Sequence, residues 1–101
     1  MIFIAEVDGE GVGLIEAYVH QTEDDPSLVP MCYMEVQSLM VLKQHRRNGI
    51  AHGLMAQARE WAKAKGATEI TLGVWEANES ARDFYQHMGF TTAHRRMTMP
   101  L

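Results

Sequence analysis

A short run of residues at positions 46–51 has the composition of a turn that can hold a phosphate group. A helix N-terminus offers backbone N–H groups without intrahelical partners and a partial positive charge, so it attracts anions. Two arginines add positive charge here, and Gly49 and Ala51 are small enough to let a ligand approach the backbone. The spacing is neither that of a P-loop nor that of the three-glycine dinucleotide fingerprint. We therefore predict a phosphate-binding turn of another kind, made of Arg46, Arg47, Asn48, Gly49, Ile50 and Ala51.

A second group of polar and aromatic residues lies at positions 78–90. Its first residue, Asn78, is of a type that caps a helix, and Gly89 is of the type that ends one. Between them Ala81, Phe84, Tyr85 and Met88 follow the spacing of one helical face. A strand is expected between this helix and the helix that begins at the phosphate-binding turn. The second helix can therefore lie beside that turn.

Other reactive residue types lack the spacing that metal or thiol chemistry needs. The five histidines form neither H-x-x-x-H nor H-E-x-x-H, so we expect no metal site. The single cysteine, Cys32, excludes an internal disulfide and a cysteine-based zinc site. It has no adjacent base, and we expect a small hydrophobic side chain there rather than an acetyl carrier. A chain with one cysteine fits a reduced, cytoplasmic setting.

The length of 101 residues is near the modal size of a domain and predicts one domain over residues 1–101. The net charge of −4 is unevenly distributed: residues 1–42 hold eight acids and no Lys or Arg, and residues 43–101 hold nine bases and five acids. This favours a cation-facing half and an anion-facing half, with an acidic hairpin and solvated helices as the plainer alternative. The pattern argues against nucleic acid as a partner. Neither a leader peptide nor a membrane-spanning run is evident, so secretion and membrane insertion are not expected.

Periodicity predicts an α/β fold with mixed strand directions. The turn residues Asp8 and Gly9 lie between two runs rich in β-branched residues and predict a hairpin. A polar segment with two prolines, 20–31, predicts a loop. Next comes a central strand, 32–42, on one face of which we expect Tyr33, Glu35, Gln37, Leu39 and Val41. The complete set of expected elements is strands 2–7, 12–19 and 32–42, helix 50–65, strand 68–74, helix 78–88 and strand 90–99.

In these two groups the chain resembles the GNAT family of N-acetyltransferases. That family has a V-x-x-x-x-R-x-x-G-x-G/A turn, matched here at 41–51, and a downstream N-x-x-A-x-x-F-Y-x-x-x-G-F helix, matched at 78–90. The resemblance covers essentially the whole chain. It implies the GNAT fold, with a mixed, mostly antiparallel central sheet flanked by helices. It also implies acetyl-CoA as the co-substrate and no metal.

The resemblance also implies roles for individual residues. In relatives the backbone of the turn binds the pyrophosphate of acetyl-CoA, which here means residues 46–51. The edge of the preceding strand pairs with the pantetheine arm, and one of its N–H groups can stabilise the oxyanion. Here that edge is the backbone of Leu39, Met40 and Val41. Asn78 is expected to bond the pantetheine, and Tyr85 to lie near the thioester sulfur.

Acetyl transfer to an amine requires an acceptor and a donor of protons. A lysine-like amine has a pKa of about 10, so its proton must be accepted, most naturally by a carboxylate acting directly or through a water. Glu35 is the only acid on the central strand and is our first choice as general base, with another acid or a water as alternatives. We predict Tyr85 as the general acid for the departing thiolate; a purely structural role for Phe84 and Tyr85 is the alternative.

The acidic first half favours a cationic acceptor, such as a polyamine, an aminoglycoside-like amine or a protein amino group. Two rival predictions stay open at this point. One is a CoA-binding regulatory or accessory module without transferase activity, and the other is an interaction domain without a ligand.

Relative to the family, the chain is expected to be short at its N-terminus. Members usually begin with another strand and one or two helices that help to wall the acceptor site. The first strand, 2–7, would then present an apolar edge of a kind that soluble proteins usually cover. We therefore expect a homodimer, or a partner segment that pairs along this edge.

Overall fold

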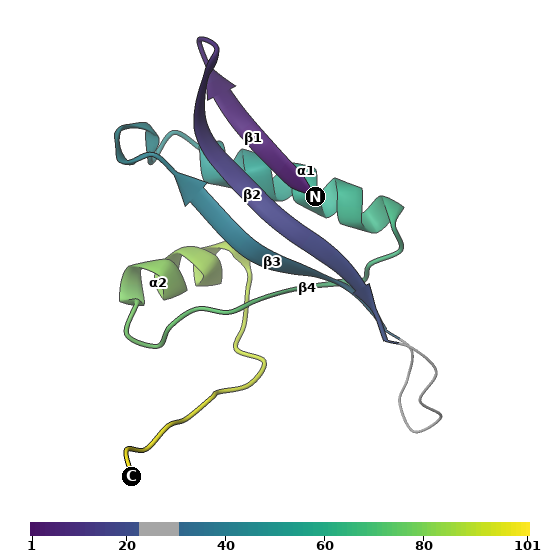
Figure 1. Ribbon diagram of the computed structural model, residues 1–101, viewed down its shortest axis with the longest axis vertical. Coiled ribbons are helices and arrows are strands. Elements are labelled where there is room, and N and C mark those ends of the chain that lie inside the picture. The colour runs from purple at the N-terminus through teal and green to yellow at the C-terminus, as the bar shows by residue number, and fades with distance from the viewer. Residues whose placement is uncertain (23–30) are drawn as a thin grey trace.

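Four strands form one sheet in the order β1-β2-β3-β4, in a computed structural model that describes residues 1–22 and 31–101. β1 (Ile2–Val7), β2 (Glu10–Gln21) and β3 (Cys32–Val41) are antiparallel neighbours. β4 (Glu69–Leu72) is parallel to β3, because the helix α1 (Ile50–Ala64) carries the chain back between them. The predicted mixed, mostly antiparallel sheet is thereby confirmed (Figure 1).

The hairpin between β1 and β2 turns at Asp8 and Gly9, whose φ angles of 52° and 80° are both positive, as a type I′ turn requires. β2 is longer than predicted: His20, expected in a loop, is a strand residue. Pairing with β3 extends the strand, and the Thr22 N–H donates to the Met31 carbonyl at 2.8 Å just beyond it. The remainder of the predicted loop, residues 23–30, lies outside the described residues.

The register between β2 and β3 shifts once. Glu16 lies opposite Ser38, whereas Ala17 lies opposite Val36, so Gln37 is an extra residue in β3. Such a β-bulge disturbs the alternation of side chains between the two faces of a sheet.

The bulge makes the predicted common face of β3 wrong. Met34 and Val36, before the bulge, belong to the buried core, and Leu39 and Val41, after it, pack against that core. Glu35 therefore lies on the opposite face from Leu39 and Val41, not beside them, because the parity of the strand changes at Gln37.

The core lies between α1 and one face of the first three strands (Figure 1). The predicted stripe on α1 is confirmed, with Leu54, Ala58 and Ala62 buried and Ile50 and Trp61 half-buried. The helix ends at Ala64, one residue earlier than predicted, and Gly66 at φ 89° supports its termination. The buried cluster consists of Ile15, Ala17, Met34, Val36, Leu54, Met55, Ala58 and Ala62.

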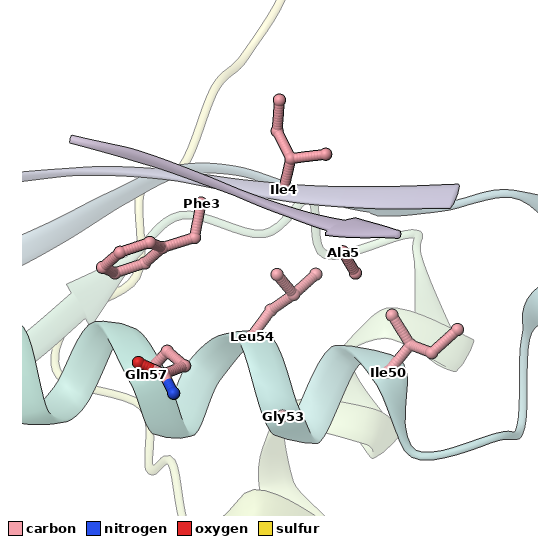
Figure 2. A pocket seen from close by; sticks show the side chains of 7 residues that line it. All are labelled: Phe3, Ile4, Ala5, Ile50, Gly53, Leu54 and Gln57. Carbon is pink, nitrogen blue, oxygen red and sulfur yellow. The ribbon is translucent and has the colours of Figure 1, made fainter. Parts of the chain in front are cut away.

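An apolar groove of about 420 Å³ lies between β1 and the first half of α1. Phe3 and Ala5 point from the strand toward the helix, and Leu54 points back between them (Figure 2). Ile4 points away from the helix and is 62% exposed, and Ile2 is 57% exposed. β1 is thus an edge strand with exposed apolar side chains, and the association expected along it stays a prediction.

The last helix, α2 (Glu79–Met88), begins and ends as predicted. The Asn78 side-chain oxygen accepts the Ala81 N–H at 3.2 Å, and Gly89 at φ 106° ends the helix.

The strand predicted at 90–99 is wrong, because residues 90–101 form neither strand nor helix. Phe90 packs on the core, but Met97 and Met99 are 83% and 81% exposed, so no buried apolar face holds this segment against a strand edge. Figure 1 shows it running away from the sheet. Within the described ranges, the helices are all too short or too polar to cross a membrane.

Gly13 offers a direct test of how closely β2 and β3 approach. A Cβ at this position would lie 2.9 Å from the Met40 carbonyl oxygen, which belongs to the backbone and cannot rotate away. Gly13→Ala is expected to lower the free energy of unfolding by about 1–3 kcal/mol in chemical denaturation.

The matched control is Gly53→Ala in α1, where a Cβ meets nothing within 4 Å. This change is expected to raise stability by about 0.5–1 kcal/mol, because alanine favours the helix. Equal stabilities of the two variants would contradict the close approach at Gly13.

Candidate functional site

The turn that leads into α1 has the backbone of an anion site. After a single 3-10 turn at Lys43–His45, Arg47 and Gly49 adopt φ angles of 67° and 77°, and α1 begins at Ile50. The first intrahelical bond runs from the Gly53 N–H to the Gly49 carbonyl at 2.9 Å. No side chain caps the helix, so the N–H groups of residues 50–52 are left for solvent or a ligand.

Charge gathers at the same place. No acidic residue lies in the first turn of α1, and residues 36–59 contain no Asp or Glu at all. The exposed side chains of Lys43, Arg46 and Arg47 surround the positive end of the helix dipole. The Arg46 Nε donates to the Val41 carbonyl at 3.0 Å, which ties this arginine to the end of β3. The arrangement favours a ligand with more than one negative charge.

The strand beside this turn has an unpaired edge. β3 pairs with β4 only from Tyr33 to Val36, and residues 37–41 continue without it. The backbone of Leu39, Met40 and Val41, predicted to meet an extended ligand, therefore lies in this unpaired stretch. A separate pocket of about 410 Å³ spans β1, β2 and the end of β3 beside the turn, and is lined by Ile4, Gly11, Val12, Gly13, Leu14, Met40, Val41, Leu42, Lys43 and Arg46.

The two groups identified in the sequence meet in space. The rings of His52, in the first turn of α1, and Phe84, on α2, lie 5.5 Å apart. The predicted placement of the second helix beside the turn is confirmed by this contact. Because the Asn78 oxygen caps α2, a hydrogen bond from Asn78 to a ligand would come from its amide nitrogen.

Tyr85 follows Phe84 on α2 and is half-buried. Its ring makes edge contacts with Phe84 and Phe90, at centroid distances of 5.4 and 5.7 Å. Burial raises the pKa of the Tyr85 hydroxyl above its ordinary value of 10.0. The phenol is therefore protonated at neutral pH and available as a proton donor.

Glu35 lies on the face of the sheet that α1 does not cover. Its side chain is 39% exposed, and its Oε1 accepts the Gln37 side-chain amide at 2.7 Å. His20 on β2 approaches the same oxygen, with its Nε2 at 3.4 Å. A carboxylate held this way on an open face can accept a proton from a bound amine.

Sequence reasoning missed His20 as a neighbour of Glu35, because residues 20–31 are predicted to form a loop. Gln37 is predicted on the same face as Glu35, and its side chain does contact that carboxylate. Pairing between β2 and β3 brings His20 close to Glu35, and the bulge positions the side-chain amide of Gln37 beside the same carboxylate. In the described part of the chain, the His, Cys, Asp and Glu side chains form no group of three or more that could hold a metal ion.

A family model described as the acetyltransferase (GNAT) family matches residues 1–90. An N-alpha-acetyltransferase from Sulfurisphaera tokodaii is 36% identical over 93 residues, covering 87% of this chain and 54% of that protein. The chain spans about half the length of curated relatives such as this one.

Solved structures of the same shape agree with this match. A mutant of a Bacillus halodurans protein superposes with a TM-score of 0.93 at 21% identity, over 99% of this chain and 64% of that one. An aminoglycoside N-acetyltransferase in complex with CoA superposes with a TM-score of 0.84 at 23% identity, over 99% and 74% of the two chains. At these identities the superpositions establish the fold.

Proposed function

Because the chain belongs to the GNAT family of acetyltransferases, we propose that it transfers an acetyl group from acetyl-CoA to a primary amine. The amine attacks the thioester directly while both substrates are bound. The observation that carries the proposal is the strand edge of β3, which continues beyond β4 and leads into an uncapped, acid-free helix N-terminus.

This part of the site fits the CoA moiety. The N–H groups at the start of α1 and the side chains of Arg46 and Arg47 suit the pyrophosphate, and Gly49 and Ala51 leave room for it. The backbone groups of residues 39–41 that face away from β2 suit the amides of the pantetheine arm, as an added strand suits a sheet edge. An N–H of this stretch is suited to stabilise the oxyanion that develops on the thioester carbonyl. Asn78 would donate its amide to the arm.

Two side chains complete the chemistry. Glu35 accepts the proton that the amine loses, directly or through a water, as the C–N bond forms. The C–S bond then breaks, and Tyr85 donates a proton to the sulfur of the departing CoA. A proton donor must be protonated at the pH of the reaction, and the Tyr85 hydroxyl, whose pKa is raised by burial, meets that condition. The products are the N-acetylated amine and free CoA.

The acceptor is proposed to be a small amine that carries positive charge. Glu16 and Glu35 lie on the same open face of β2 and β3, away from the basic turn. The aminoglycoside N-acetyltransferase among the solved structures acts on amines of this class, which supports the choice. The printed names of other relatives include an N-alpha-acetyltransferase, so a protein amino group is the second candidate acceptor.

Binding of CoA is tested by placing an acid in the first turn of α1. Ala51→Glu is expected to abolish the thermal stabilisation that CoA gives the wild-type chain, because the carboxylate repels phosphate and fills the space beside the turn. Saturation at 100 times the dissociation constant should add about 2.7 kcal/mol to the wild-type free energy of unfolding.

The control for this experiment is Ala56→Glu, which adds the same charge at an exposed position farther along the same helix. It should keep the full shift with CoA. A wild-type chain that shows no shift at millimolar CoA would exclude acetyl transfer as well as the rival CoA-binding module.

Turnover is tested with Glu35→Gln and Tyr85→Phe. Each is expected to lower kcat by about 100-fold or more, because general acid and base catalysis contributes about 10²–10⁴. Free thiol release from acetyl-CoA with a panel of amines gives the rates, and a CoA thermal shift shows that cofactor binding is kept.

Glu60→Gln, an exposed position on α1 that pairs with Lys63 at 3.6 Å, is the control and should retain the wild-type rate. Full activity of Glu35→Gln would remove Glu35 from the mechanism. CoA binding without thiol release for any amine would favour the accessory module instead.

A further inference from the structure

We propose that His20 is a positioning residue that orients the Glu35 carboxylate toward the acceptor amine, a role that rests on the proposed function. The register of the sheet brings the two side chains to one face. Tyr18 lies opposite Glu35 and His20 lies opposite Tyr33, so His20 is the diagonal neighbour of Glu35. The His20 Nε2 is 3.4 Å from the Glu35 Oε1.

The imidazole of His20 is itself held in place. Its ring stacks on Tyr33, with a centroid distance of 5.3 Å and an interplanar angle of 30°. Both residues belong to paired strands, β2 and β3, so the stack has a fixed backbone on each side. A histidine fixed in this way can direct a carboxylate, whereas a freely rotating surface histidine cannot.

Two side chains approach the same oxygen of Glu35. Gln37 donates a hydrogen bond to Oε1 at 2.7 Å, and the His20 Nε2 lies 3.4 Å from the same Oε1. Within the described ranges, no hydrogen bond to Oε2 is present, so this oxygen is free to accept a proton from the amine. Holding one carboxylate oxygen while leaving the other free fixes the direction from which a proton can be accepted.

The other polar groups near Glu35 do not perform this task. Tyr18, directly opposite, donates its hydroxyl to Glu16 Oε2 at 2.7 Å. Thr71, the parallel neighbour on β4, makes no hydrogen bond to Glu35 among the described residues. Glu69 lies opposite Tyr33 on the same face and carries charge of the same sign as Glu35. Gln37, which donates to Glu35, and His20, whose Nε2 lies 3.4 Å from it, are therefore the side chains that hold Glu35 in the described part of the chain.

Two substitutions of His20 separate the polar contact with Glu35 from the stacked ring. His20→Phe keeps an aromatic ring for stacking on Tyr33 but removes the ring nitrogen that lies near Glu35, and His20→Gln places an amide N–H at a similar reach. His20→Phe is expected to lower kcat about ten-fold while leaving KM for acetyl-CoA unchanged, since a polar contact with the carboxylate is lost. His20→Gln should restore most of the rate. His94→Phe, an exposed position outside the sheet, is the control and should match the wild type.

The same substitution is then made in the Glu35→Gln background. If His20 acts through Glu35, His20→Phe should cause no further loss of kcat there, and the two effects will be non-additive. Any general effect of His20→Phe on stability is present in both backgrounds and cancels in this comparison. Thermal unfolding of each variant measures that effect in parallel.

Five outcomes decide whether His20 has this role. The proposal stands if His20→Phe lowers kcat, His20→Gln restores it and the loss disappears in the Glu35→Gln background. An active enzyme in which His20→Phe keeps full kcat overturns the role of His20 alone. The role of His20 alone is also overturned if His20→Gln is as slow as His20→Phe, or if His20→Phe lowers kcat equally in the wild-type and Glu35→Gln backgrounds. A wild-type chain that transfers no acetyl group overturns the proposed function, and this role with it.

Discussion

Strand β3 pairs with β2 along nearly its whole length but with β4 only as far as Val36, and this unequal pairing places Glu35 and the open strand edge of the candidate site. Backbone N–H and C=O groups need hydrogen-bond partners. Those of residues 37–41 that face away from β2 are therefore satisfied by water, by a ligand or, for the Val41 carbonyl, by the Arg46 side chain. The bulge at Gln37 falls where the pairing with β4 stops. One point in the strand thus opens an edge for an extended ligand and turns Glu35 to the face that α1 leaves uncovered.

The scaffold and the site depend on different physical terms. Ile15 and Met34 are fully buried between the sheet and α1, and a side chain of this kind contributes about 1.5–3 kcal/mol through burial. The site groups Arg46, Arg47 and Glu35 are exposed or half-buried, where charge contributes little to stability. These groups contribute by their positions. Cations and free N–H groups lie at one end of β3, and carboxylates lie on the open face of β2 and β3. Substitutions in the site should therefore change function with little effect on folding.

Much of this arrangement could be predicted because its signals are local. Asp8 and Gly9 mark the hairpin, Asn78 and Gly89 mark the ends of α2, and the apolar spacing marks α1. Each of these depends on a few consecutive residues. The basic turn lies beyond the end of β3, whereas Glu16 and Glu35 lie along the open face of β2 and β3.

The features that could not be predicted from the sequence depend on contacts between segments distant in the chain. No glycine or proline marks the bulge at Gln37, which arises from the register between β2 and β3. His20 could not be assigned to a strand because its partner, Tyr33, follows a segment with two prolines. The strand predicted after Phe90 failed for a related reason: alternation of residue types gives a strand only where a sheet edge receives it.

Binding of acetyl-CoA along the edge of β3 can be followed in the backbone amide NMR signals of the chain while acetyl-CoA is added. The amides of Leu39–Val41 and Gly49–His52 are expected to shift together, while those of β1 and β4 change little. Shifts gathered instead in the groove between β1 and α1, at Phe3–Ala5 and Gly53–Gln57, would contradict this expectation, as would no shift at saturating acetyl-CoA.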